Sequence, residues 1–398
     1  MKICLVTETY PPEINGVAKT LHRISHDLKT LGHSVTIIRP HQSGEAKVSK
    51  IPYITIVPSL PIPIYQGLHF GLPCRTLLKK MWGNDKPDIV YVATEGPLGV
   101  SAINLARKMK IAVTSGFHTN FHKYMQHYRL PLMSKLTEYF LKKTHNKTLR
   151  TFAPTEDVIQ QLKNMGVNNT HLLGRGVDTE LFHPSKRDHA LRESWGIHSD
   201  DQYAAIFVSR IAAEKNIPLA INAFKRIKAD NPNASCIFVG DGPEKHRLEK
   251  KYPEYKFVGT KTGELLAKYY ASGDLFIFPS LTETFGNVIP EAMASSLIPI
   301  AFNYAAPKAL IEDKANGYLA DYNDSDSFMK TLEFALSQKN EWEKMRKHAR
   351  QTAEKLNWIN IVENFAQELH KAYLEHHNHE SYQYPSPLGK PQSSKNLQ

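Results

Sequence analysis

The sequence predicts an α/β protein with two Rossmann-like domains, each built around a parallel sheet. Two observations lead to this prediction. The chain has 398 residues, which is too long for one ordinary hydrophobic core and fits two domains of roughly 150 to 200 residues each. Short β-branched or apolar runs alternate with longer amphipathic stretches, and strands that alternate with helices in this way form βαβ units around parallel sheets.

The first domain is expected to begin with a strand and a helix. We expect strands at residues 3–7, 35–38, 54–57, 88–93, 111–115 and 151–154. After the first strand, apolar residues recur at steps of three and four, as they do on one face of a helix. These residues are Val17, Leu21, Ile24, Leu28 and Leu31. Gly16 opens the helix, and Gly32 follows its last turn, where glycine is common.

The alternating pattern lapses at the polar residues 183–187 and resumes afterwards. We therefore expect a first domain at residues 1–184 and a second at 185–358. Strands of the second sheet are expected at residues 203–208, 235–239, 256–258, 274–279 and 298–302. A late helix is expected at about 359–375. Residues 376–398 are rich in His, Ser, Pro, Asn and Gln with hardly any apolar side chains, which predicts a disordered tail.

Composition narrows the class of protein. The hydrophobic fraction of 41% and the charged fraction of 22% are those of a globular protein. The first eight residues lack the apolar core of a signal peptide, and no run of about 18 apolar residues predicts a membrane span. Three widely spaced cysteines, Cys4, Cys74 and Cys236, suit buried thiols in a reducing compartment. We therefore expect a cytoplasmic location. The net charge of +11 indicates an anionic partner without identifying it.

The strongest local signal follows the expected strand at 274–279. Residues 280–284 form a loop, and Phe285-Gly286-Asn287-Val288 leads into a helix. Backbone N–H groups at such a turn suit a diphosphate or sugar hydroxyls, and Gly286 lets a ligand approach closely. Glu283 and Glu291 can both face one crevice and accept hydrogen bonds from vicinal hydroxyls. The same spacing also allows Glu283 to cap the helix and Glu291 to lie on the surface.

A second signal places two cations at the carboxyl edge of the same sheet. The expected strand at 203–208 is followed by Ser209-Arg210 and then by Glu214-Lys215. Ligands of doubly wound sheets bind at this edge, and an Arg/Lys pair suits the neutralisation of a departing diphosphate without a metal ion. The alternative is that the cations pair with Glu214 or are solvated.

These segments, together with Asn15-Gly16-Val17, resemble glycosyltransferase family 4, whose members have the GT-B fold of two Rossmann-like domains facing each other across a cleft. The resemblance covers residues 2 to about 374. It implies that the C-terminal helix crosses back to the first domain, that Arg210 and Lys215 hold the donor diphosphate, and that Glu291 binds the ribose. It also implies that Gly16 closes on the donor, and that the sugar or its phosphate is held by Glu283 and by the backbone of Phe285, Gly286, Asn287 and Val288.

Further segments resemble a branch of the family that contains GDP-mannose-dependent α-mannosyltransferases and sulfoquinovosyl-diacylglycerol synthases. They are 94–99, 116–121, 175–178 and 302–306. In this branch a histidine matching His118 lies beside the donor sugar. The implied activity is a retaining, metal-independent hexosyl transfer, with catalytic residues His118, Arg210, Lys215 and Glu283. GDP-mannose is the first candidate donor and a UDP-sugar the second, with a lipid or glycan acceptor. A GT-B nucleotide-sugar epimerase and a non-catalytic basic binding protein are the alternatives.

Other signals have simpler explanations. The pairs His22/His26 and His118/His122 have helical metal-ligand spacing but no evident third ligand, so no metal site and no cofactor are expected. Asp324 and Asp326 precede an expected helix and most simply cap it. Residues 122–150 are basic and amphipathic. They suit either peripheral binding to an anionic membrane or a solvated helix, and no recognised motif for nucleic-acid binding accompanies the charge.

Overall fold

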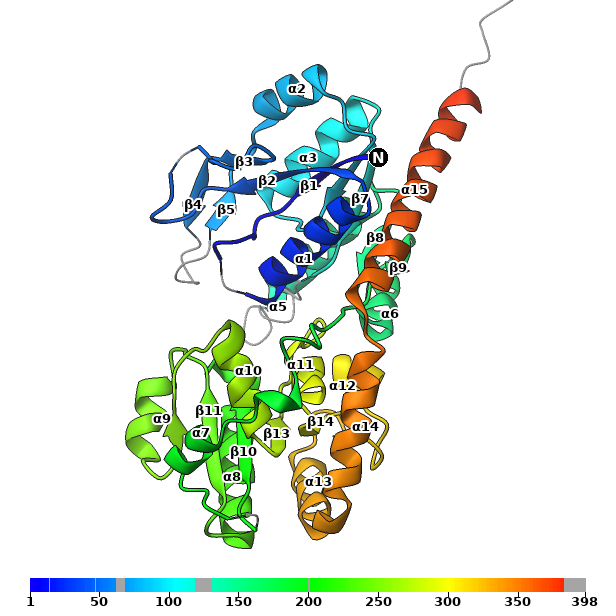
Figure 1. Cartoon of the computed structure of the whole chain (residues 1–398). Coiled ribbons are helices and arrows are strands. Elements are labelled where there is room, and N and C mark those ends of the chain that lie inside the picture. Colours follow the sequence, from blue (N-terminus) through cyan, green and yellow to red (C-terminus); the bar gives the residue numbers. More distant parts are fainter. Residues whose placement is uncertain (14, 47, 62–68, 119–130, 200, 383–398) are drawn as a thin grey trace, which may run out of the picture.

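A computed structural model describes the chain except residues 14, 47, 62–68, 119–130, 200 and 383–398. It contains two α/β halves, one above the other in Figure 1, and a long C-terminal helix that runs alongside the upper, N-terminal half. Each half has its own parallel sheet with helices packed against it. The predicted fold class is confirmed.

The N-terminal sheet has the strand order β3-β2-β1-β6-β7-β8-β9, and all of its neighbouring pairs are parallel. Its strands are β1 (Lys2–Val6), β2 (Ser34–Pro40), β3 (Ile54–Val57), β6 (Ile89–Val92), β7 (Ala112–Gly116), β8 (Thr151–Ala153) and β9 (Thr170–Leu172). A small antiparallel pair, β4 (Ser59–Pro61) and β5 (His69–Gly71), lies beside it. The six predicted strands are present. The edge strand β9 was not predicted because its residues are polar or partly exposed.

Helices of this half alternate with the strands. They are α1 (Gly16–Thr30), α2 (Arg75–Asn84), α3 (Pro97–Lys108), α5 (Pro131–His145) and α6 (Glu156–Asn164). The Asn15 side chain caps α1 by accepting a hydrogen bond from the N–H of Ala18. The predicted apolar face of α1 is buried in the core at Leu21, Ile24 and Leu28. This cap and this face orient the first turn of α1 toward the other half of the molecule.

The C-terminal sheet has the order β12-β11-β10-β13-β14-β15 and is also parallel. Its strands are β10 (Ala204–Val208), β11 (Ser235–Val239), β12 (Lys256–Phe257), β13 (Leu275–Phe278), β14 (Ile298–Phe302) and β15 (Tyr318–Ala320). Its helices are α7 (His189–Ser194), α8 (Ile217–Asp230), α9 (Lys245–Lys251), α10 (Gly263–Ser272), α11 (Val288–Ala294), α12 (Ala306–Leu310), α13 (Ser325–Ser337) and α14 (Trp342–Glu354). The strand order reverses between β10 and β13, where ligands of open α/β sheets bind.

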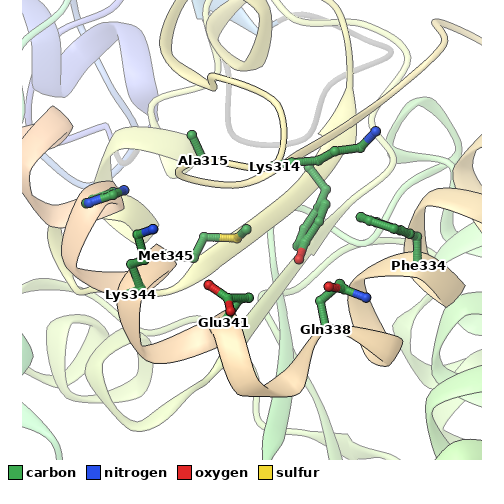
Figure 2. A pocket seen from close by; sticks show the side chains of 9 residues that line it. Lys314, Ala315, Phe334, Gln338, Glu341, Lys344 and Met345 are labelled. Carbon is green, nitrogen blue, oxygen red and sulfur yellow. The ribbon is translucent and has the colours of Figure 1, made fainter.

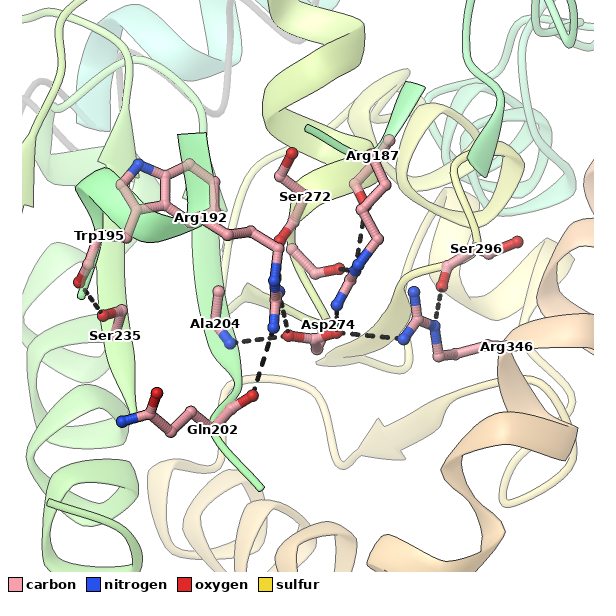
Figure 3. A network of polar contacts seen from close by, with 12 residues as sticks. Arg187, Arg192, Trp195, Gln202, Ala204, Ser235, Ser272, Asp274, Ser296 and Arg346 are labelled. Atoms are coloured by element: carbon pink, nitrogen blue, oxygen red, sulfur yellow. Dashed lines mark hydrogen bonds and ion pairs between the residues drawn. The ribbon is translucent and has the colours of Figure 1, made fainter. Parts of the chain in front are cut away.

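The segment that enters the second domain is anchored by a buried acid. The Asp274 carboxylate pairs with Arg187 at 2.8 Å, with Arg192 at 2.9 Å and with Arg346 of α14 at 3.1 Å (Figure 3). It also accepts the backbone N–H of Ala204 at 2.8 Å. Burial would raise the pKa of Asp274, but the three guanidinium groups and this N–H hold it below its ordinary value. The network ties the entering segment, α14 and the start of two strands together.

The C-terminal helix α15 (Trp358–Tyr382) returns to the N-terminal domain, as predicted. Its Trp358, Phe365 and Leu369 belong to the same core cluster as residues of the N-terminal sheet. The prediction that disorder begins at residue 376 is wrong for residues 376–382, because the helix continues to Tyr382. The physical reasons are an ion pair of Glu375 with Arg150 at 2.7 Å and the absence of proline from residues 358–384. Residues 383–398 lie outside the described part of the chain.

Candidate active site

The predicted donor loop connects β13 to α11 at the carboxyl edge of the second sheet. Phe285 is buried in the core, and Gly286 has φ +100°, a conformation that favours glycine. Within the described part of the chain, the backbone N–H groups of Gly286, Asn287 and Val288 donate no hydrogen bond. Helix α11 follows the loop directly and ends at Ala294. The loop therefore offers a row of donors to a ligand.

The structure brings the two predicted motifs together through Lys215 and Glu283. Their ammonium and carboxylate groups form an ion pair, and their side chains are 12% and 13% exposed. The Ser280 hydroxyl also donates to Glu283, at 2.8 Å. The alternative that Glu283 caps α11 is wrong, because Asn287 occupies the N-cap and no side chain caps this helix. A nearly buried cation and the donor loop thus lie side by side.

Arg210 pairs with Glu214, which is the alternative considered for it. The Arg210 side chain is 43% exposed, whereas that of Glu214 is 6% exposed. The buried carboxylate therefore holds the guanidinium itself at the sheet edge, where it remains partly exposed to solvent. The sequence pattern gave no reason to assign a role to Glu214 beyond this pairing.

Glu291 lies on α11 and is partly buried, not fully exposed. The Tyr270 hydroxyl of α10 donates to its carboxylate at 3.1 Å. Burial raises the pKa of Glu291 to about 7, although the positive charge of Lys19 and the bond from Tyr270 oppose the rise. The surface alternative for Glu291 is therefore wrong. Lys19 belongs to the N-terminal domain, so this carboxylate faces the junction of the two domains.

His118 follows β7 and is buried, with both ring nitrogens bonded. Nδ1 lies 2.5 Å from Nη2 of Arg175, and Nε2 lies 2.6 Å from the Tyr91 hydroxyl. Because a guanidinium can only donate, Nδ1 accepts, and Nε2–H donates to Tyr91. Burial, followed by the charges of Arg175 and His145, lowers the pKa of His118 well below its ordinary value. His118 is thus a neutral, fixed ring. Tyr91 was not predicted as a functional residue.

Two hydrogen bonds between described residues connect the donor loop to the N-terminal domain. The Thr284 hydroxyl donates to the carbonyl of His118 at 2.8 Å. The Asn287 amide donates to the carbonyl of Gly16 at 3.4 Å. The donor loop therefore contacts the segments of the N-terminal domain that carry Gly16 and His118.

Two tyrosines hold the donor loop: Tyr304 lies in the family-like segment 302–306, whereas Tyr322 was not predicted as a functional residue. Tyr304 donates to the carbonyl of Glu283 at 3.0 Å, and Tyr322 donates to the carbonyl of Leu281 at 2.8 Å. Their rings lie 4.7 Å apart between centroids. The next residue, Ala305, has φ +58°, and its N–H faces Asp157 of the N-terminal domain at 3.4 Å. The bonds from Tyr304 and Tyr322 fix the backbone of the donor loop, and the contact of Ala305 with Asp157 ties the following segment to the N-terminal domain.

The remaining predictions concern metal binding and the Asp324 cap. Among the described residues no group of three or more His, Cys, Asp or Glu side chains is arranged to hold a metal ion, and His122 lies outside the described residues. Asp324 caps α13 by accepting from the N–H of Ser327 at 2.9 Å, as predicted.

The basic segment 122–150 is described only from residue 131. Its helix α5 exposes Leu136, Tyr139 and Phe140, which are 68%, 63% and 44% exposed. Basic side chains follow in the last turn of α5. None of the helices in the described ranges is long and apolar enough to cross a membrane.

A hollow of about 250 Å³ lies elsewhere on the C-terminal domain (Figure 2). Its walls come from the segment before β15 and from α13 and α14. They include Lys314, Ala315, Phe334, Gln338, Glu341, Lys344 and Met345. None of the predicted site residues lines it.

Comparison with known families matches both halves of the chain. Residues 14–181 match Glycosyltransferase Family 4, and residues 190–352 match Glycosyl transferases group 1. A GDP-mannose-dependent alpha-mannosyltransferase from Corynebacterium glutamicum is 32% identical over 83% of this chain and 79% of its own length. The sulfoquinovosyl transferase SQD2 of Arabidopsis thaliana is 27% identical over 90% of this chain and 71% of its own length.

Solved structures agree on the fold. A sucrose-phosphate synthase from Thermosynechococcus elongatus superposes with a TM-score of 0.75 at 15% identity, covering 94% of this chain and 100% of the other. The Anabaena protein HepE in complex with UDP superposes with a TM-score of 0.73 at 17% identity, covering 93% and 100%. The chain has the GT-B architecture, and with a mannosyltransferase relative above 30% identity it belongs to glycosyltransferase family 4.

Proposed function

We propose that this glycosyltransferase moves a hexose from a nucleotide sugar to a lipid or glycan acceptor, with retention at the anomeric carbon and without a metal ion. GDP-mannose is the first candidate donor. The observation on which the proposal rests is the meeting of Lys215, Glu283 and the backbone donors at 286–288 beside the edge of the N-terminal sheet. Cations and N–H groups converging on one point suit a diphosphate.

Binding of the donor would replace the carboxylate partners of Lys215 and Arg210 by the diphosphate. The diphosphate would take Lys215 and Arg210, which are now neutralised by Glu283 and Glu214. Glu283, released from Lys215, would accept hydrogen bonds from sugar hydroxyls, and Glu291 would accept them from the ribose. The carboxylates thus act as holders of hydroxyl groups rather than as the general acid and base.

The reaction then depends on the leaving group. The bond between the anomeric carbon and the diphosphate oxygen breaks, and the acceptor oxygen bonds to the same face of the sugar. The proton of the acceptor hydroxyl passes to the departing diphosphate oxygen. Lys215, Arg210 and the backbone donors stabilise the negative charge that develops there. The neutral His118, held by Tyr91 and Arg175, borders the sugar and limits its orientation.

The choice of donor and acceptor is supported by the relatives. The relative from Corynebacterium glutamicum and one from Mycobacterium tuberculosis, 29% identical over 80% of this chain and 83% of its own length, are named as GDP-mannose-dependent. HepE was solved with UDP, which keeps a UDP-sugar as the second candidate. An alpha-monoglucosyldiacylglycerol synthase from Acholeplasma laidlawii, 29% identical, supports a lipid acceptor. The exposed apolar and basic residues of α5 suit a peripheral site on an anionic bilayer at the inner face of the cell membrane.

The test is transfer of a labelled sugar. Purified protein is incubated with labelled GDP-mannose, UDP-glucose or UDP-galactose, with and without vesicles that contain diacylglycerol and anionic phospholipid, in the presence of EDTA. We expect label in the lipid phase with GDP-mannose, unaffected by EDTA, and an α-linked product. Isomerised donor without acceptor would indicate an epimerase. No turnover of any donor with any acceptor would favour the non-catalytic binding protein and refute the proposal.

A further inference from the structure

The charged side chains assigned to the diphosphate and the sugar have no excess of positive charge. Arg210 is paired with Glu214 and Lys215 with Glu283, so these four side chains carry no net charge together. The diphosphate of a nucleotide sugar, which is esterified at both ends, brings about two negative charges near neutral pH. A further cation near the donor loop would add to the attraction that the backbone N–H groups at 286–288 exert on a diphosphate.

Lys19 is a cation in the right place. It lies on the first turn of α1, is exposed, and its ammonium forms no hydrogen bond or ion pair with any residue in the described ranges. Its charge acts on Glu291 across the domain junction. It is thus near the carboxylate that we assign to the ribose, and its ammonium is available to a ligand.

Helix geometry agrees with a position of Lys19 near Glu291. Residues three or four apart lie on the same face of a helix. Gly16 and Lys19 are three apart on α1, and Asn287 and Glu291 are four apart at the start of α11. Asn287 donates to the carbonyl of Gly16 at 3.4 Å. Lys19 and Glu291 therefore each lie about one turn further along their helices from this contact, which agrees with the electrostatic effect of the Lys19 charge on Glu291.

We propose that Lys19 is a donor-binding residue that the N-terminal domain contributes, and that its ammonium contacts the diphosphate of the nucleotide sugar. The proposal rests on the proposed function. Its consequence is that the donor bridges the two domains, because Lys215 and Arg210 belong to the C-terminal domain and Lys19 to the N-terminal domain. Donor binding and closure of the cleft are then one event.

The test compares the binding of nucleoside diphosphates with that of nucleosides. Binding of GDP, UDP, guanosine and uridine is measured by calorimetry at low salt for wild type, Lys19→Ala and Lys19→Arg. We expect Lys19→Ala to weaken diphosphate binding about ten-fold, or about 1.4 kcal/mol, with nucleoside binding unchanged and with recovery in Lys19→Arg. Added salt should reduce the difference between wild type and Lys19→Ala.

The matched control is Lys108→Ala, which removes an exposed lysine from the last turn of α3. It should bind both ligands as wild type does. Equal weakening of nucleoside and diphosphate in Lys19→Ala would show that Lys19 only supports Glu291 and would overturn the proposal, as would unchanged diphosphate binding. Wild-type protein that binds neither diphosphate would overturn the proposed function together with this inference. Diphosphate binding by wild type that Lys19→Ala leaves intact would overturn the inference alone.

Discussion

Replacing Lys215 by Ala should separate a structural role of this residue from a catalytic one. Lys215 and Glu283 are nearly buried, at 12% and 13% exposed. Removing the ammonium takes the cation away from a carboxylate that is largely shielded from water. Loss of one partner of a fully buried pair costs about 3–5 kcal/mol. Because this pair retains some exposure and Ser280 still donates to Glu283, we expect a smaller loss of about 2 kcal/mol.

The double variant Lys215→Ala/Glu283→Gln provides the comparison. It removes the unbalanced charge, so most of the lost stability should return. In thermal unfolding, Lys215→Ala should melt about 4–8 °C below wild type for a domain of this size, and the double variant should melt within a few degrees of wild type. Turnover should fall by roughly 10²-fold or more in both variants, because neither can stabilise the departing diphosphate.

Turnover of the two variants, compared with their melting temperatures, can contradict the proposed role of Lys215 in two ways. Turnover that recovers in the double variant along with stability would mean that Lys215 acts only by balancing Glu283. Turnover close to wild type in Lys215→Ala, measured well below its melting temperature, would remove Lys215 from the mechanism.

Three further predictions concern other parts of the site and the fold. Burial raises the pKa of Glu291 from 4.5 to about 7, so the folded protein binds this proton more tightly than the unfolded chain does, and the protein loses stability as pH rises between these two values. The variant Glu291→Gln should therefore melt at a higher temperature than wild type at pH 8 and at the same temperature near pH 4.5, and it should bind nucleosides more weakly. A difference in melting temperature that does not change with pH would contradict this explanation. Asp274→Asn should destabilise the protein by about 3–5 kcal/mol in urea unfolding at pH 7, because it leaves Arg187, Arg192 and Arg346 without their shared carboxylate; a change below about 1 kcal/mol would show that the network contributes little. Gly286→Ala places a side chain at φ +100°. It should lower the free energy of unfolding by about 1–2 kcal/mol and weaken diphosphate binding by distorting the loop. The control Gly83→Ala on α2, whose new Cβ meets nothing within 4 Å, should have neither effect.

The sequence predicted most of the sheets because their central strands are buried on both faces and appear as continuous apolar runs, as at Ser235–Val239 and Ile298–Phe302. The edge strand Thr170–Leu172 lacks such a run and was missed. The end of α15 was missed because polar composition alone was taken to indicate disorder. The polar residues of 376–382 continue a helix that an ion pair to Arg150 stabilises.

At the site, the sequence identified residues but not their partners. It could not decide whether Lys215 or Arg210 pairs with Glu214, and the structure assigns Glu214 to Arg210 and Glu283 to Lys215. The bonds to His118 come from residues 27 and 57 positions away, so no local pattern could predict them. Segment 302–306 marks Tyr304 but not its bond to the carbonyl of Glu283, and the bond of Tyr322 to the carbonyl of Leu281 is likewise determined by tertiary packing.

The central claim is that residues 283–291 and the cations facing them form the cradle of a nucleotide sugar. The most direct measurement is a crystal structure of the protein with GDP or UDP bound. We predict that the diphosphate lies within hydrogen-bond distance of the Lys215 ammonium, the Arg210 guanidinium and the N–H groups of 286–288, with the ribose hydroxyls on Glu291. A nucleotide bound away from these groups, for example in the hollow lined by Lys314 and Lys344, would contradict the claim.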